Sequence, residues 1–129
     1  MSTAPTNIKI KRVYEPADEE DGTRILVDRL WPRGVSKQDA RLDQWNRELA
    51  PSPELRRWFG HQISRWREFS RRYRLELAGH PQALAELRRC AQQGPVTLIY
   101  AAKDKHHNHA IVLKNVLLGH ASLEERSRG

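Results

Sequence analysis

Hydrophobic positions gather in short β-favouring runs near both ends of the chain. Three runs predict strands, at Ile8–Val13, Arg24–Leu30 and Val96–Ala101. The Ile-Leu-Val run of the second is typical of a strand buried on both faces, and the third is the strongest strand pattern in the chain.

The middle of the chain has helical spacing instead. Leu42, Trp45 and Leu49 fall on one face of a helix that Ser36 would cap, and Ser52 with Pro53 begins another. Three further helices are predicted from about Ser64, over Pro81–Gln93 and after Asn108. Their apolar faces are formed by Trp66, Phe69, Tyr73 and Leu77, by Leu84 and Leu87 with Cys90 or Ala91, and by Ala110, Leu113 and Leu117.

This order of elements predicts a small three-layer α/β domain. The helical middle segment separates the strands too far for a tight hairpin, so we expect a partly parallel sheet with the helices as its crossover. Residues 1–7 are expected to be a disordered leader, 8–121 a single domain and 122–129 a frayed tail.

Composition narrows the class of protein. The chain has 129 residues, and none of its apolar runs approaches the length of a membrane span, so no membrane partner is expected. The first residues lack the apolar segment of a secretory signal, which favours a cytoplasmic protein. A single cysteine, Cys90, excludes an internal disulfide and fits an inert core thiol.

Positive charge is concentrated in the middle of the chain. The net charge is +7, and residues 29–74 hold 12 Lys/Arg against 5 Asp/Glu, so the whole excess lies there. Arginine accounts for 17 of the 23 cations, and its planar fork suits phosphate or carboxylate. The block therefore indicates either an anionic partner or a solvated arginine-rich surface.

The loop after the second predicted strand is the first candidate site. Arg29, Trp31 and Arg33 lie there, beside Asp28, and the loop leads into a helix N-terminus. Ligands of open α/β sheets collect beyond the carboxyl ends of strands, and the two arginines could hold an anion. The alternative is a structural salt bridge with Trp31 as a lid on the core.

The segment after the last predicted strand is the second candidate. His106, His107 and His109 lie close together, but their spacing matches no metal-site motif and no metal is predicted. His109 follows the cap residue Asn108, and the helix dipole there favours a neutral imidazole that could act as a base. Lys103 could bind the same anion or belong to a solvated turn.

If the two loops meet, their polar side chains would form one cleft. The candidate catalytic residues are Asp28, His61 and His109, and the candidate ligand-binding residues are Arg29, Trp31, Arg33, Lys103 and Asn108. No cofactor is predicted, because the chain has no GxGxxG, P-loop or GxSxG motif.

Several motifs in order resemble the YeaO-like branch of the domain of unknown function 488 family over nearly the whole chain. They are Lys11-Arg12-Val13-Tyr14, residues 27–34 (VDRLWPRG), Trp45, residues 49–52 (LAPS), Leu55-Arg56, Trp58-Phe59, His61, Phe69, Tyr73, residues 96–104 (VTLIYAAKD) and Asn108-His109-Ala110. Ile63-Ser64 departs from the family, where charged residues are common. The resemblance implies a small bacterial cytoplasmic α/β protein and no particular reaction.

Three functions remain open. The first is an enzyme or binder that acts on a phosphorylated or nucleotide-like small molecule in the cleft. The second is a nucleic-acid-binding module, in which arginines interleaved with Trp58, Phe59, Trp66 and Phe69 would contact a strand, although these aromatic residues also fit a core face. The third is a non-catalytic interaction protein.

Overall fold

The computed structural model describes residues 7–120. The leader predicted at residues 1–7 therefore lies almost wholly, and the tail predicted at 122–129 wholly, outside the described residues. The strands are β1 (Ile8–Arg12), β2 (Thr23–Leu26), β3 (Gln44–Trp45) and β4 (Val96–Tyr100). The α-helices are α1 (Lys37–Ala40), α2 (Pro53–Phe59), α3 (Trp66–Ala78), α4 (Pro81–Gln93) and α5 (His109–Leu117).

The strands form one sheet in the order β1-β4-β2-β3, and each neighbouring pair is parallel. The predicted α/β class is confirmed, and the part of the sheet that the sequence left undecided is parallel as well. Every residue of β4 is buried, as a central strand covered on both faces must be. Because the strands run the same way, the loops that follow β1, β2 and β4 meet at one edge.

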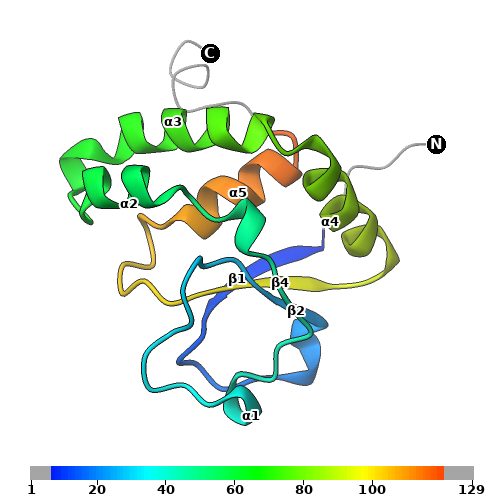
Figure 1. Cartoon of the computed structure of the whole chain (residues 1–129). Helices are drawn as coiled ribbons and strands as arrows, with labels where there is room; N and C mark the ends of the chain where they lie inside the picture. Colours follow the sequence, from blue (N-terminus) through cyan, green and yellow to red (C-terminus); the bar gives the residue numbers. More distant parts are fainter. Residues whose placement is uncertain (1–6, 121–129) are drawn as a thin grey trace.

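Helices cover one face of this sheet and a long loop covers the other (Figure 1). The larger core packs α2, α3, α4 and α5 on the helical face, around residues such as Phe69, Tyr73 and Leu113. A smaller core on the opposite face places Val13, Leu26 and Ile99 beneath Trp31 and Trp45. The third layer is therefore the segment 27–43, which contains the short helix α1.

The helix predicted from Ser36 through Leu49 is wrong. Ser36 does cap α1, but the helix ends at Ala40 because Arg41 adopts a left-handed conformation with φ 47°. The next residues form β3, where Gln44 and Trp45 pair with Ile25 and Leu26 of β2. The apolar spacing of this segment reflects burial against the sheet edge and not the face of a helix.

The second predicted strand is shorter than expected and ends at Leu26. The backbone N–H of Val27 still donates to the carbonyl of Ile99 at 3.0 Å, after which the chain leaves the sheet. Residues 28–30 are thereby freed from pairing and lie at the carboxyl edge. This early departure places Asp28 beyond the carboxyl end of β2.

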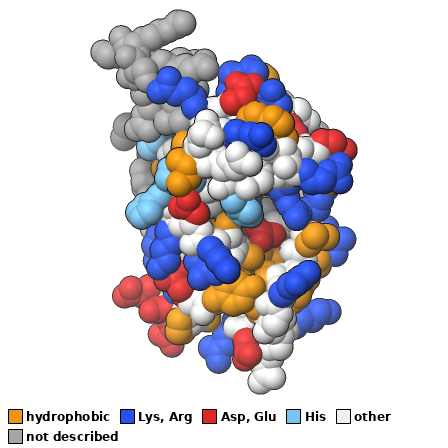
Figure 2. Space-filling model, turned by 90° about the vertical axis from the view of Figure 1, so that its left-hand side faces the viewer, with side chains coloured by type: hydrophobic (Ala, Val, Ile, Leu, Met, Phe, Trp, Pro, Cys, Tyr) orange, Lys and Arg blue, Asp and Glu red, His pale blue; other side chains and the backbone are white. Residues whose placement is uncertain are grey.

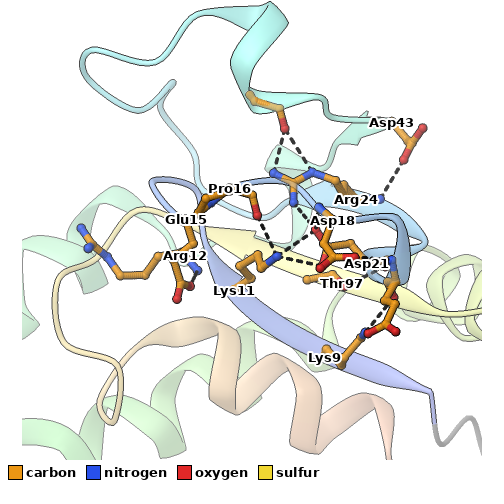
Figure 3. A network of polar contacts seen from close by, with 12 residues as sticks. Lys9, Lys11, Arg12, Glu15, Pro16, Asp18, Asp21, Arg24, Asp43 and Thr97 are labelled. Carbon is orange, nitrogen blue, oxygen red and sulfur yellow. Dashed lines mark hydrogen bonds and ion pairs between the residues drawn. The ribbon is translucent and has the colours of Figure 1, made fainter.

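A buried ionic network connects the loop before β2 with the segment that follows it, on the sheet face opposite the helices (Figure 3). Asp21 accepts hydrogen bonds from Arg24 at 2.6 Å and from Lys11 at 3.0 Å. Arg24 also donates to the carbonyl of Ala40 through Nε and Nη2, and its backbone N–H donates to Asp43. The network thus joins β1, the loop before β2 and the end of α1.

Candidate functional site

A pocket of about 730 Å³ opens at the carboxyl edge of β2 and β4. It is bounded by the loops that follow these strands, by α2 and by one turn of α3. Figure 2 shows this side of the molecule, with apolar side chains in a hollow that histidine, lysine and arginine side chains surround. The lining residues are Asp28, Arg29, Leu30, Trp31, Pro32, Pro51, Arg56, Arg57, Phe59, His61, Phe69, Ala101, Ala102, Lys103, Asp104, His107, Asn108 and His109.

Asp28 and His109 form a pair at the base of the pocket. His109 Nε2 lies 2.9 Å from Asp28 Oδ1 and 3.0 Å from the backbone oxygen of Val27. Nε2 is aligned with the Val27 carbonyl, whereas Asp28 Oδ1 lies close to the ring without a well-aligned hydrogen bond. The other carboxylate oxygen, Oδ2, accepts from the backbone N–H of Ala101 at 3.1 Å, so the pair also joins the two loops.

One wall of the pocket is aromatic. The rings of Phe59 and Phe69 stack with their centroids 4.4 Å apart, and both residues are buried. His61 lies beside Phe59 at 6.1 Å, at the exposed end of α2. Little of either ring is exposed, 5% of Phe59 and 2% of Phe69, so the wall offers a bound ligand a small apolar contact.

Three cations stand around the opening without an ionic partner in the described part of the chain. Arg56 and Arg57 project from α2 and Lys103 follows β4, and all three are exposed. Two acidic residues line the pocket, and each is engaged elsewhere: Asp28 beside His109, and Asp104 with His107 and nearby backbone N–H groups. The rim therefore carries positive charge that no acidic side chain within residues 7–120 pairs with.

Arg29 and Trp31 have structural partners as well as places on the pocket wall. The Arg29 guanidinium donates to the carbonyls of Ala50 and Pro51, at 3.3 and 3.2 Å. The Trp31 indole donates to the carbonyl of Val35 at 2.7 Å and packs edge-on against Trp45. These contacts give both side chains a structural role, through backbone carbonyls and not through the salt bridge that the sequence offered as the alternative.

The loop after β4 is held by its own polar side chains. Asp104 accepts from the backbone N–H groups of His106 and His107, and its carboxylate contacts the His107 ring at 3.0 Å. These hydrogen bonds, first that from His106, lower the pKa of Asp104. Asn108 is buried and caps α5 by accepting from Ile111, so its first role is to position the helix that carries His109.

The pocket brings together seven of the eight residues that the sequence singled out: Asp28, Arg29, Trp31, His61, Lys103, Asn108 and His109. Arg33 is exposed and does not line it, since its loop turns away toward Tyr14, whose hydroxyl donates to the Arg33 carbonyl. The roles assigned to these residues stay predictions.

Sequence reasoning placed Arg56 and Arg57 on a general basic surface, whereas both line the pocket. Phe59 is a core residue, as expected, and lines the pocket as well. Their proximity to His61 in the sequence was the available signal.

The three neighbouring histidines point to different partners. His107 contacts Asp104 and Trp66, His109 contacts Asp28, and His106 is exposed. Within residues 7–120, no group of three His, Cys, Asp or Glu side chains is arranged to hold a metal ion. No helix in this range is long and apolar enough to span a membrane.

Trp58, one of the aromatic residues among the central arginines, is covered by arginine side chains. Two guanidinium groups lie over the Trp58 ring, that of Arg72 at 4.3 Å and that of Arg65 at 5.2 Å from the ring centroid. Glu68 pairs with Arg71 and Arg72, whose hydrogen bonds lower its pKa to about 2. A base stacking on Trp58 would have to displace these arginines, which makes this surface a poor stacking platform.

Known proteins resemble this chain over a range that includes every residue lining the pocket. A family model described as "Inactive DUF488-N3 subclade" matches residues 7–128. The chain is 49% identical over 111 residues to the uncharacterized protein YeaO of Escherichia coli strain K12, an alignment that covers 86% of this chain and 96% of that protein. It is 45% identical over 114 residues to an uncharacterized protein of Mycobacterium tuberculosis strain H37Rv, covering 88% and 96%. No solved structure gives a significant match.

Proposed function

Because the chain belongs to the YeaO-like DUF488 family, in a subclade described as inactive, we propose that its pocket binds a phosphorylated, nucleotide-like small molecule without transforming it. The observation that carries the proposal is the combination of an aromatic wall with three cations that have no ionic partner within residues 7–120, around one pocket of about 730 Å³. This volume lies in the range of small-molecule sites, which are mostly apolar with a few well-placed polar groups.

The chemistry of the lining supports binding more than catalysis. No serine, threonine or cysteine is among the lining residues in the described chain, so the hydroxyl and thiol nucleophiles used in covalent catalysis are missing from the wall. The N–H of His109 is already directed to Val27, and Asp28 accepts from Ala101. Both side chains are thereby held in fixed positions at the base of the pocket.

The test is calorimetric titration with inorganic phosphate, AMP and UMP, at low and high salt. We expect one saturable site whose affinity for a nucleotide falls when Arg57 is replaced by alanine. A hydrogen bond to a charged group contributes about 1.5–3 kcal/mol, which corresponds to a loss of roughly 10- to 150-fold. Arg33→Ala is the matched control, because it removes an exposed arginine outside the pocket and should leave affinity unchanged.

Other outcomes separate the alternatives. Equal weakening by Arg57→Ala and Arg33→Ala would show that binding follows net charge and would refute the pocket. An oligonucleotide that binds with a steep salt dependence and is indifferent to Arg57 would favour the nucleic-acid surface. Phosphorus NMR of the nucleotide should show no conversion over hours, and hydrolysis would contradict the non-catalytic part of the proposal.

A further inference from the structure

A continuous row of rings leads from the mouth of the pocket to its base. His61 contacts Phe59, Phe59 stacks on Phe69, and Phe69 lies 5.8 Å from Tyr73. The Tyr73 ring is in turn edge-on to His109, with centroids 6.3 Å apart. Exposure falls along the row from an exposed His61 to a fully buried Tyr73. Tyr73 itself is core and does not line the pocket, but Phe59, Phe69 and His109 do, so a planar group lying against the phenylalanines shares the pocket with His109.

The rim cations fix which end of such a ligand faces outward. Arg56, Arg57 and Lys103 are exposed at the opening, whereas His109 lies at the base with a side chain 14% exposed. A phosphate attracted to the rim leaves the ring of the same ligand to enter the pocket. The recognition of the ring then depends on the polar atoms at the base.

The tautomer of His109 follows from its neighbours. Nε2 faces two acceptors, the Val27 carbonyl at 3.0 Å and Asp28 Oδ1 at 2.9 Å, so this nitrogen must carry a hydrogen. A hydrogen on the other ring nitrogen, Nδ1, would find no acceptor within residues 7–120. Nδ1 is left as a lone-pair acceptor, and no partner within residues 7–120 donates to it.

We infer that His109 Nδ1, with its tautomer fixed by Asp28 and Val27, accepts a hydrogen bond from an N–H on the ring of the ligand. The inference rests on the proposed function and adds its specificity. The ligand is a nucleotide whose base presents an N–H donor on its leading edge, the phosphate lying between Arg56, Arg57 and Lys103. His109 acts here as a specificity-determining residue and performs no proton transfer.

Matched ligands test the inference with the unmodified protein. AMP is compared with purine riboside 5′-monophosphate, which lacks the base N–H groups, and UMP with N3-methyl-UMP. Loss of one buried hydrogen bond corresponds to about 5- to 10-fold in affinity, so at least one parent nucleotide should bind that much more tightly than its partner. Affinities that agree within about twofold in both pairs would overturn the inference and leave the proposed function standing. If phosphate, nucleotides and analogues all fail to bind, the proposed function itself is refuted.

A variant and a spectrum locate the effect at His109. His109→Phe keeps a ring at the base and should remove the preference for the parent nucleotide, whereas His106→Phe, an exposed change outside the pocket, should retain it. Long-range ¹⁵N–¹H NMR of the unmodified protein should show Nε2 protonated and Nδ1 bare, with the Nδ1 resonance shifting on nucleotide binding. A protonated Nδ1 in the free protein, or an Nδ1 resonance unmoved at saturation, would contradict the inference even if the variant does not fold.

Discussion

Replacing Asp21 by asparagine removes the anion from the buried network of Figure 3 while keeping the shape of the side chain. Asp21 and Arg24 are each 4% exposed, and their ion pair is 2.6 Å long. In the variant the Arg24 guanidinium keeps the Ala40 carbonyl but loses its counter-ion, and the new amide hydrogens face a cation.

The expected loss follows from the cost of an unpaired buried charge. Removing one member of a buried ion pair destabilises a protein by about 3–5 kcal/mol. Lys11, the second cation on Asp21, is partly exposed and can return to water, so we expect the lower end, about 3 kcal/mol. For a chain of this size the entropy of unfolding is about 0.25 kcal/mol/K, and the midpoint should fall by about 12 °C.

The pH dependence of the stability difference shows whether the lost ion pair is its cause. Burial raises the pKa of Asp21, but hydrogen bonds from Lys11, from the Asp18 backbone and from Arg24 outweigh it, and the net pKa lies below its ordinary value of 3.8. The stabilisation is therefore complete above the unfolded pKa and is lost as pH falls toward the lower folded pKa. The difference in stability between the natural protein and Asp21→Asn should be full at about pH 6 and shrink by about pH 2.5.

Differential scanning calorimetry across this range measures both quantities. Glu19→Gln, a neutralisation of an exposed acid two residues away, should change stability by less than about 0.5 kcal/mol. A difference between the natural protein and Asp21→Asn that stays constant down to acid pH would refute the ionic explanation. So would a variant as stable as the natural protein at about pH 6.

Two further substitutions test the packing. Gly22→Ala should destabilise by at least about 2–3 kcal/mol in urea unfolding, since Gly22 has φ 65° and a Cβ would lie 2.2 Å from the Pro95 carbonyl oxygen; a variant of unchanged midpoint would contradict this close approach. Tyr73→Phe should cost about 1–3 kcal/mol at an unchanged m-value, because it strips the buried carbonyl of Leu49 of its donor; a neutral effect would mean that this carbonyl finds another partner.

Local signals along the chain gave most of the element boundaries. Ser52 accepts from Leu55 with Pro53 at the first helical position, as predicted for α2, and α4 spans the predicted Pro81–Gln93. Such features depend on residues within one or two turns of each other. They can therefore be recognised without knowledge of the rest of the molecule.

The helix predicted from Ser36 to Leu49 was wrong for the opposite reason. Its apolar spacing fits a helix, yet Trp45 is paired to β2 and its indole donates to the carbonyl of Asp28 at 2.7 Å. A two-residue strand leaves almost no periodicity of its own. Only the presence of an open edge on β2 makes the extended conformation the better one.

The sequence by itself determined that polar residues follow two buried strands, and parallel strands bring such ends to one edge. Tertiary structure decided which side chains face the pocket. Arg33 lies on a loop that turns toward Tyr14, while Arg57 and Phe59, far along the chain from Asp28, are carried to the site by α2. The reason is physical: strand order and helix docking are set by burial of the whole core, and burial is shared among residues that no local pattern connects.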